Sequence, residues 1–90
     1  MVSSLPRNLL EKFARLYAEK GTSEFRFQEA EEILGETEKY VGQILPNLVR
    51  AGWLEKKVDP EDNRRKIYRI VDPNKTLQRL GHDLKDDAPR

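Results

Sequence analysis

The first segment with a clear hydrophobic pattern covers residues 4–21. Its apolar side chains recur three or four positions apart, at Leu9, Leu10, Phe13, Leu16 and Tyr17. This spacing predicts an amphipathic helix, because residues three and four positions apart share one helix face. Ser3 or Ser4 is expected to cap the helix, Pro6 is tolerated in its first turn, and Gly21 ends it.

Two short elements are expected next. Residues 24–27 alternate polar and aromatic side chains, which predicts a brief strand. Residues 28–35 place Ala30, Ile33 and Leu34 on one face and glutamates opposite, which predicts a short second helix. The glycine that closes this segment favours a helix end.

A third helix is expected in residues 38–51, after a cap at Thr37. Its apolar stripe consists of Val41, Leu45 and Leu48. Pro46 lies inside this helix, where it removes one hydrogen bond and crowds the carbonyl group of Gly42. Because glycine leaves the backbone free to adjust, we expect a bend near these residues. The alternative is a break between two shorter helices.

Two β-compatible runs follow, in residues 53–58 and 65–71, with a polar loop between them. Asp59 and Pro60 suit the first two positions of a type I turn, since the Asp side chain bonds the local backbone and Pro presets the dihedral angle. The pattern therefore predicts a β-hairpin. Three of its apolar residues are expected in the core: Trp53, Tyr68 and Ile70.

A short helix is expected to close the chain. Asp72 and Pro73 fit a cap and a first helical residue for residues 74–84. The apolar stripe of this helix consists of Leu77, Leu80 and Leu84. Residues 85–90 are expected to form a frayed tail.

Composition narrows the class of protein. A chain of 90 residues with 37% hydrophobic content suits one small core. The absence of cysteine excludes disulfides and thiolate zinc sites and fits a reducing compartment, so we expect a cytoplasmic protein. No segment approaches the roughly twenty apolar residues of a membrane span, and the N-terminus does not have the pattern of a secretion signal.

The sequence contains none of the common motifs of an enzyme active site. It contains no glycine-rich phosphate loop, no cysteine nucleophile and no histidine paired with a nucleophile. The single histidine, His82, lies in a polar segment without a second metal ligand nearby. We therefore expect neither an enzyme nor a site for a metal or cofactor.

The net charge of +1 conceals an uneven distribution. Residues 21–40 hold two basic and six acidic side chains, whereas residues 50–70 hold seven basic and four acidic ones. The local potential, and not the total charge, determines whether a phosphate backbone is attracted. The hairpin is thus the basic part of the chain. Alternatively, it is only a solvated strand pair with cross-strand contacts between Glu and Arg.

The expected elements follow the order helix, short strand, helix, tight turn, helix and β-hairpin. This order resembles that of the winged-helix domain. That domain is an α+β fold, mainly α-helical, with a three-helix core and a hairpin wing. Residues 44–70 are similar to the helix-to-wing part of MarR-type prokaryotic transcriptional regulators. The similarity lies in Leu45 and Leu48, in the Ala-Gly pair that ends the helix, and in the apolar residues that begin the next strand. The wing carries the motif Asp-x-x-Asp-x-Arg, at Asp59, Asp62 and Arg64. The resemblance implies a winged-helix domain in residues 1–72, followed by a C-terminal helix and tail in residues 73–90.

This resemblance implies sequence-specific binding of double-stranded DNA by a transcriptional regulator. The third helix would enter the major groove through Thr37, Lys39, Tyr40 and Gln43. The wing would reach the minor groove or the backbone, with Asp62 holding Arg64 and Asp59 stabilising the turn. Further cationic contacts would come from Arg50, Lys56, Lys57, Arg65 and Lys66.

Some residues depart from the pattern of these regulators. Glu61 stands where many wings carry a base, and Glu36 and Glu38 lie close to the expected phosphates. Such carboxylates weaken binding by a monomer, and a homodimer would double the contacts. The leucine stripe of the last helix either pairs with a second copy or lies back on the first helix.

A second functional class stays open, since the winged-helix fold also serves as a protein-interaction module in larger assemblies. The expected surface for a protein partner is the acidic face of the second helix, formed by Glu29, Glu31 and Glu32.

Overall fold

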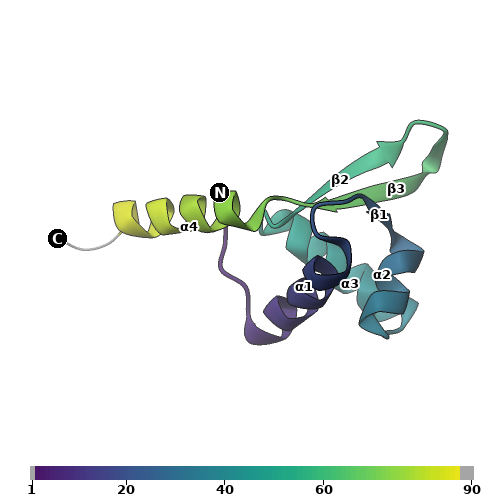
Figure 1. Ribbon diagram of the computed structural model, residues 1–90, viewed down its shortest axis with the longest axis horizontal. Coiled ribbons are helices and arrows are strands. Elements are labelled where there is room, and N and C mark those ends of the chain that lie inside the picture. The colour runs from purple at the N-terminus through teal and green to yellow at the C-terminus, as the bar shows by residue number, and fades with distance from the viewer. Residues whose placement is uncertain (1, 88–90) are drawn as a thin grey trace.

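The computed structural model describes residues 2–87 and contains four helices and a three-stranded sheet (Figure 1). In chain order these are α1 (Arg7–Lys20), β1 (Phe25–Arg26), α2 (Phe27–Leu34), α3 (Glu38–Arg50), β2 (Leu54–Asp59), β3 (Asp62–Ile70) and α4 (Pro73–Asp87). The sheet is antiparallel with strand order β1-β3-β2. The predicted fold class, a mainly helical winged helix-turn-helix, is confirmed.

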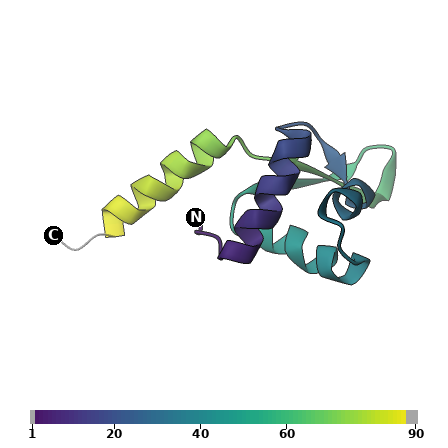
Figure 2. The ribbon, with the colours of Figure 1, turned by 60° about the horizontal axis from the view of Figure 1, so that its bottom comes forward.

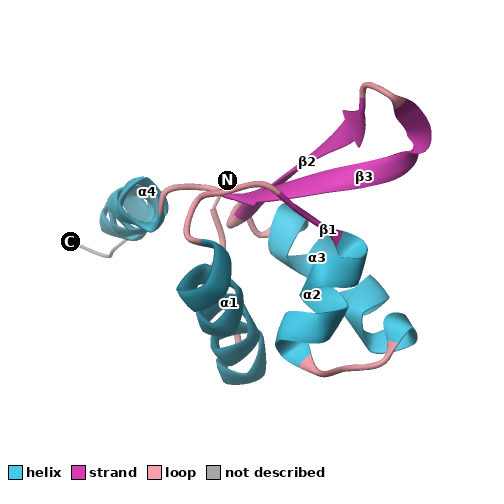
Figure 3. Cartoon of the chain, turned by 45° about the vertical axis from the view of Figure 1, so that its right-hand side comes forward, coloured by secondary structure: helices cyan, strands magenta, loops and turns pink. Residues whose placement is uncertain are grey.

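Figures 1 and 3 show how these elements are arranged. Helices α1, α2 and α3 form one body, and the β2–β3 hairpin, here called the wing, extends from it. Helix α4 projects from the other side of the molecule, and Figure 2 shows the same separation from a second direction. The described chain is accordingly elongated, with extents of 49 × 27 × 21 Å.

The core lies between the three helices and the base of the sheet. Its fully buried side chains come from all of these elements and include Leu16, Phe25, Leu34, Ile44, Leu48 and Ile70. Trp53 and Tyr68 are also buried, as predicted. The Trp53 ring packs edge-on against Phe13, and its Nε1 donates a 2.7 Å hydrogen bond to the carbonyl oxygen of Ser3. The indole therefore buries its polar atom without an unpaired donor.

The start of α1 differs from the prediction. Pro6 occupies the cap position and no side chain caps the helix, so the expected role of Ser3 or Ser4 is wrong. Ser3 is held elsewhere, because its amide donates a 3.0 Å hydrogen bond to the carbonyl oxygen of Ala51. The N-terminal segment is therefore tied to the end of α3, a contact between distant residues that local pattern does not reveal.

Helix α3 runs without interruption through Pro46, so the alternative of two shorter helices is wrong. Thr37 caps it as predicted, with its Oγ1 accepting a 3.2 Å hydrogen bond from the amide of Tyr40. Helix α4 is longer than expected: it reaches Asp87 and includes part of the segment predicted as a tail. The remaining tail residues, 88–90, lie outside the described residues.

The wing turns at Pro60 and Glu61, between the paired residues Asp59 and Asp62. The amide of Glu61 donates a 2.9 Å hydrogen bond to Oδ1 of Asp59, which is the local bond predicted for this turn. Val58 pairs with Lys66, so three residues of β3 have no partner in β2. This irregularity is a bulge in β3, and it places Arg64 and Arg65 outside the regular hydrogen-bonded ladder.

Candidate nucleic-acid interface

Helix α3 presents a polar face opposite its buried stripe. Val41, Ile44, Leu45 and Leu48 are buried, and the other side of the helix exposes Lys39, Gln43 and Arg50. These three predicted site residues are therefore available to a partner. An amide such as Gln43 can bond a base edge, and the flanking cations suit phosphates.

The other two residues predicted for this face are placed differently. The ring of Tyr40 is half-buried against the core, and the Lys12 ammonium lies 6.0 Å from its centroid. The hydroxyl group of Thr37 is occupied by the helix cap. The structure thus turns Tyr40 toward α1, so it does not stand among the exposed residues of α3.

Asn47 is an exposed residue of α3 that the sequence analysis did not include. It lies four positions after Gln43, on the adjoining part of the helix surface. Its side-chain oxygen accepts a hydrogen bond from the Arg50 guanidinium. The helical spacing from Gln43 was the signal that could have identified it.

All five predicted cations of the wing are exposed: Lys56, Lys57, Arg64, Arg65 and Lys66. Lys57 forms an ion pair with Glu24, on the segment before β1. Lys66 and Arg64 have no ion pair within the described residues, so their charges are not offset by a bound carboxylate. The wing therefore offers at least two uncompensated cations close to its tip.

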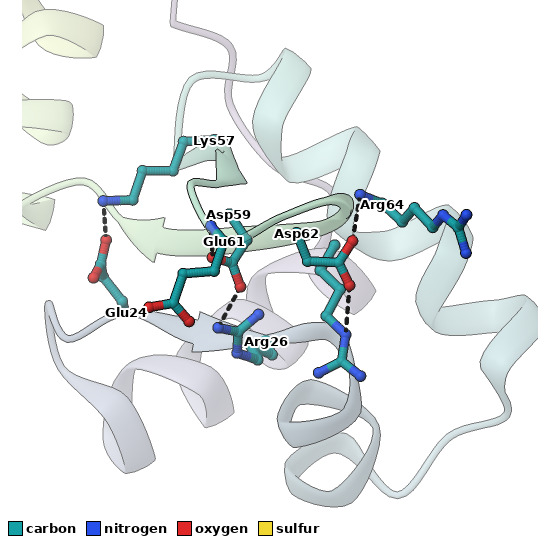
Figure 4. A network of polar contacts seen from close by, with 8 residues as sticks. Glu24, Arg26, Lys57, Asp59, Glu61, Asp62 and Arg64 are labelled. Carbon is teal, nitrogen blue, oxygen red and sulfur yellow. Dashed lines mark hydrogen bonds and ion pairs between the residues drawn. The ribbon is translucent and has the colours of Figure 1, made fainter.

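Asp62 organises the tip, although not in the way predicted. Its Oδ1 accepts a 3.0 Å hydrogen bond from the backbone amide of Arg64, and its Oδ2 lies 3.5 Å from Nε of Arg65. Figure 4 shows the Arg64 side chain extending away from Asp62. The predicted pairing of Asp62 with Arg64 thus involves only the backbone, while the ion pair belongs to Arg65. The Arg64 guanidinium is left available.

A further ion pair ties the wing to the helical body. Nη2 of Arg26, in β1, lies 2.6 Å from Oδ2 of Asp59. Figure 4 marks this ion pair with a dashed line. The Asp59 side chain is only 8% exposed, and its hydrogen bond from the Glu61 amide, together with Arg26, lowers the pKa of its carboxyl group. Arg26 was missed by the sequence analysis, because its partner is distant along the chain.

The acidic face of α2 is partly neutralised by α1. Lys20 forms an ion pair with Glu29, and Lys12 lies 2.6 Å from Glu36 in the following turn. The Lys20 ammonium lowers the pKa of Glu29, with a smaller effect from the backbone amide of Arg26. Less free negative charge therefore remains on this face than the sequence suggested, and it rests mainly on Glu32 and Glu31.

Neither a metal site nor a membrane span is found in residues 2–87. No group of three or more His, Asp or Glu side chains lies close enough together to hold a metal ion within this range. None of the helices in the same range is long and apolar enough to cross a membrane.

Several solved structures have the same architecture. The PcaV transcriptional regulator from Streptomyces coelicolor, solved with its natural ligand, is 26% identical, with a TM-score of 0.61. The MepR–DNA complex from S. aureus is 22% identical, with a TM-score of 0.63. A mutant MarR from E. coli, bound to operator DNA, is 17% identical, with a TM-score of 0.62. The match covers 92–96% of this chain in these three cases, and this protein resembles these MarR-family winged-helix regulators in fold.

The sequence comparisons add one relative. The chain is 35% identical over 68 residues to the methylase subunit of the type I restriction enzyme MjaVIII from Methanocaldococcus jannaschii, which covers 71% of this chain. No family model matches the sequence. The chain spans 12% of that subunit and 60–66% of the three regulators.

Proposed function

We propose that this protein binds double-stranded DNA in a sequence-specific manner as a transcriptional regulator. Helix α3 would occupy the major groove, and the wing would lie on the minor groove or the backbone. The observation that carries the proposal is the exposed polar face of α3 next to a wing with unpaired cations. Glu38 and Lys66 line the same pocket, so the start of α3 lies beside the wing.

Each surface has its own task in this proposal. Gln43 can form two hydrogen bonds with a base edge, and Lys39 and Arg50 can contact phosphates on either side of it. The Arg64 side chain, which forms no ion pair with Asp62, can enter a narrow minor groove, where the potential is more negative. Specificity would therefore come mainly from α3, and much of the affinity from the wing.

Two copies of the chain are proposed to bind together. Leu77 and Leu84 of α4 are 55% and 61% exposed, so they do not lie back on α1. Leu80, by contrast, packs against the core. A second copy that covers Leu77 and Leu84 would bury the exposed leucines and double the number of phosphate contacts.

The proposal is tested by the fluorescence anisotropy of labelled random-sequence duplex DNA at two salt concentrations. Binding is expected to weaken steeply with salt, because each phosphate contact releases counterions. The double variant Arg64→Glu and Arg65→Glu should weaken binding to every sequence and reduce the salt dependence. Arg7→Glu is the matched control, because Arg7 lies at the exposed start of α1. No binding by the unchanged protein at low salt would overturn the proposal.

A second candidate function follows from the match to the methylase subunit. A segment similar to this chain forms part of a much longer subunit of a restriction enzyme. We therefore also consider a winged-helix interaction module of a larger assembly, with Glu31 and Glu32 of α2 as the contact surface. Recovery of one stoichiometric partner, lost when both residues become lysine, would support this role. Retention of that partner by the variant would exclude this surface.

A further inference from the structure

A pocket of about 390 Å³ separates the wing from the helix-turn-helix. Residues from four elements line it: Arg26 of β1, Phe27 and Gln28 at the start of α2, Glu38 of α3, and Arg64 and Lys66 of β3. The elements of the proposed DNA-binding surface therefore converge on this single hollow.

Arg26, which lines this pocket, has one donor without a partner within the described part of the chain. One guanidinium nitrogen, Nη2, is bound to Asp59, which fixes the orientation of the group. The other terminal nitrogen, Nη1, is buried and has no hydrogen-bond partner in residues 2–87. A buried donor without a partner is costly. The Arg26 side chain is 39% exposed, and a planar guanidinium whose orientation is fixed by a carboxylate can bond an oxyanion through its exposed part.

The charges around the pocket favour an anion, although not uniformly. Arg64 and Lys66 carry no carboxylate partner within the described residues, whereas Arg65 is paired with Asp62. The first-turn amides of α2 add to the positive potential, because the cap residue Arg26 supplies no side-chain cap. Glu31 and Glu38 also line the pocket and oppose an anion. The pocket lining thus contains both groups that attract an anion and groups that repel it, and each can be substituted separately.

We infer that this pocket binds one phosphate group of the DNA backbone, with the exposed part of the Arg26 guanidinium group as its central donor. This inference rests on the proposed function, because the backbone between a major-groove helix and a minor-groove wing passes over the space that separates them. The bound phosphate would add a second anionic partner to the Arg26 guanidinium group. It would also couple the wing to α2 when DNA is present.

The test is a pair of titrations of the ¹⁵N-labelled protein, one with inorganic phosphate and one with duplex DNA, followed by NMR. The signals observed are the amides of Phe27 and Gln28 and the Nε–H of Arg26. Both titrations are expected to move these signals, inorganic phosphate in the millimolar range, and DNA should displace phosphate. The conservative variant Arg26→Lys retains a cation facing Asp59 but has no second guanidinium nitrogen. It should bind DNA about tenfold more weakly, while Arg7→Gln should bind as the unchanged protein does.

The outcomes separate this inference from the proposed function. DNA binding that leaves the pocket signals unmoved would overturn the phosphate site and leave the proposed function standing. Phosphate binding without any DNA binding would make the pocket a site for a free anion and overturn both proposals. Absence of both kinds of binding would also overturn both.

A second variant covers the case in which Arg26→Lys disturbs the wing, which the Glu61 amide signal would reveal. Glu31→Gln lies outside the ion pair of Arg26 with Asp59 and removes a repulsive charge from the pocket. Its affinity for DNA should rise about two- to threefold, in the direction opposite to the loss of a contact. An unchanged or weaker affinity would contradict the inference.

Discussion

At the scale of single residues, Asp59 connects the wing turn to the body of the protein. Its pKa in the folded state is lowered, first by the Glu61 amide and then by Arg26. A carboxyl group of this kind stabilises the fold above its unfolded pKa, and this stabilisation is lost as pH falls through the lower, folded pKa. The contribution should therefore be complete at neutral pH and begin to decline once pH falls to about 4, the unfolded pKa.

Asp59→Asn should consequently lower the free energy of unfolding at pH 7 and flatten its decline in acid. Urea denaturation at pH 7 and pH 3 measures both effects. Asp62→Asn is a suitable control on the same hairpin, because its side chain is 44% exposed and solvent screens its ion pair. An Asp59→Asn variant with the same acid dependence as the unchanged protein would argue against the role of this contact.

The limits of sequence reasoning are clearest at this scale. The bond between Asp59 and the Glu61 amide is local, and the turn residues alone predicted it. The pair of Arg26 with Asp59 joins β1 to the wing tip, and no short-range pattern encodes it. The half-buried placement of Tyr40 was not predictable for the same reason, since it depends on packing against the core and beside Lys12 of α1. The sequence thus predicted which residues belong to the candidate site. Their ion-pair and packing partners depended on the fold.

At the scale of elements, α3 contains a glycine that can be replaced by a larger residue without a steric clash. Gly42 is exposed in a regular helical conformation, and a Cβ atom there would meet no atom within 4 Å. Gly42→Ala should therefore stabilise the protein by about 0.5–1 kcal/mol, because alanine loses less backbone entropy in a helix. The midpoint of thermal unfolding should rise by roughly 3–6 °C for a domain of this size.

Gly35→Ala provides the matched control for this prediction. A Cβ atom at Gly35 also meets no atom within 4 Å, but the residue ends α2 with φ at +63°. An alanine there is strained, so the same substitution should lower the unfolding midpoint. Destabilisation by both substitutions would show that α3 is constrained at Gly42 by more than its helix geometry.

The elements themselves were the most predictable part of the structure. Regular spacing of apolar residues located all four helices, and alternation with turn residues located the wing. The errors lie at the boundaries of α1 and α4, where Ser3 is bound to Ala51 and where Asp87 extends the helix. Boundaries depend on contacts and on propensity over one or two residues, which the hydrophobic period does not determine.

At the scale of the whole molecule, the position of α4 determines what the protein can bind. Figures 1 and 2 show this helix projecting away from the three-helix body, so its exposed leucines are not covered by the described part of the same chain. Thr76 and Leu80 anchor the inner side of α4, while Leu77 and Leu84 face outward. A stripe of two leucines spaced seven residues apart suits a neighbouring helix from a second copy.

The double variant Leu77→Glu and Leu84→Glu should therefore convert a dimer into a monomer. Sedimentation equilibrium measures the molecular mass directly, and anisotropy should show a DNA affinity lower by roughly tenfold or more, because half of the phosphate contacts are lost. Gln78→Glu adds a charge on an exposed position of the same helix and should leave both quantities unchanged. Because association stabilises the folded state, the thermal midpoint of Gln78→Glu should rise with protein concentration, whereas that of the monomeric variant should not. A monomer before any substitution would contradict the prediction, and DNA binding would then depend on α3 and the wing of a single chain.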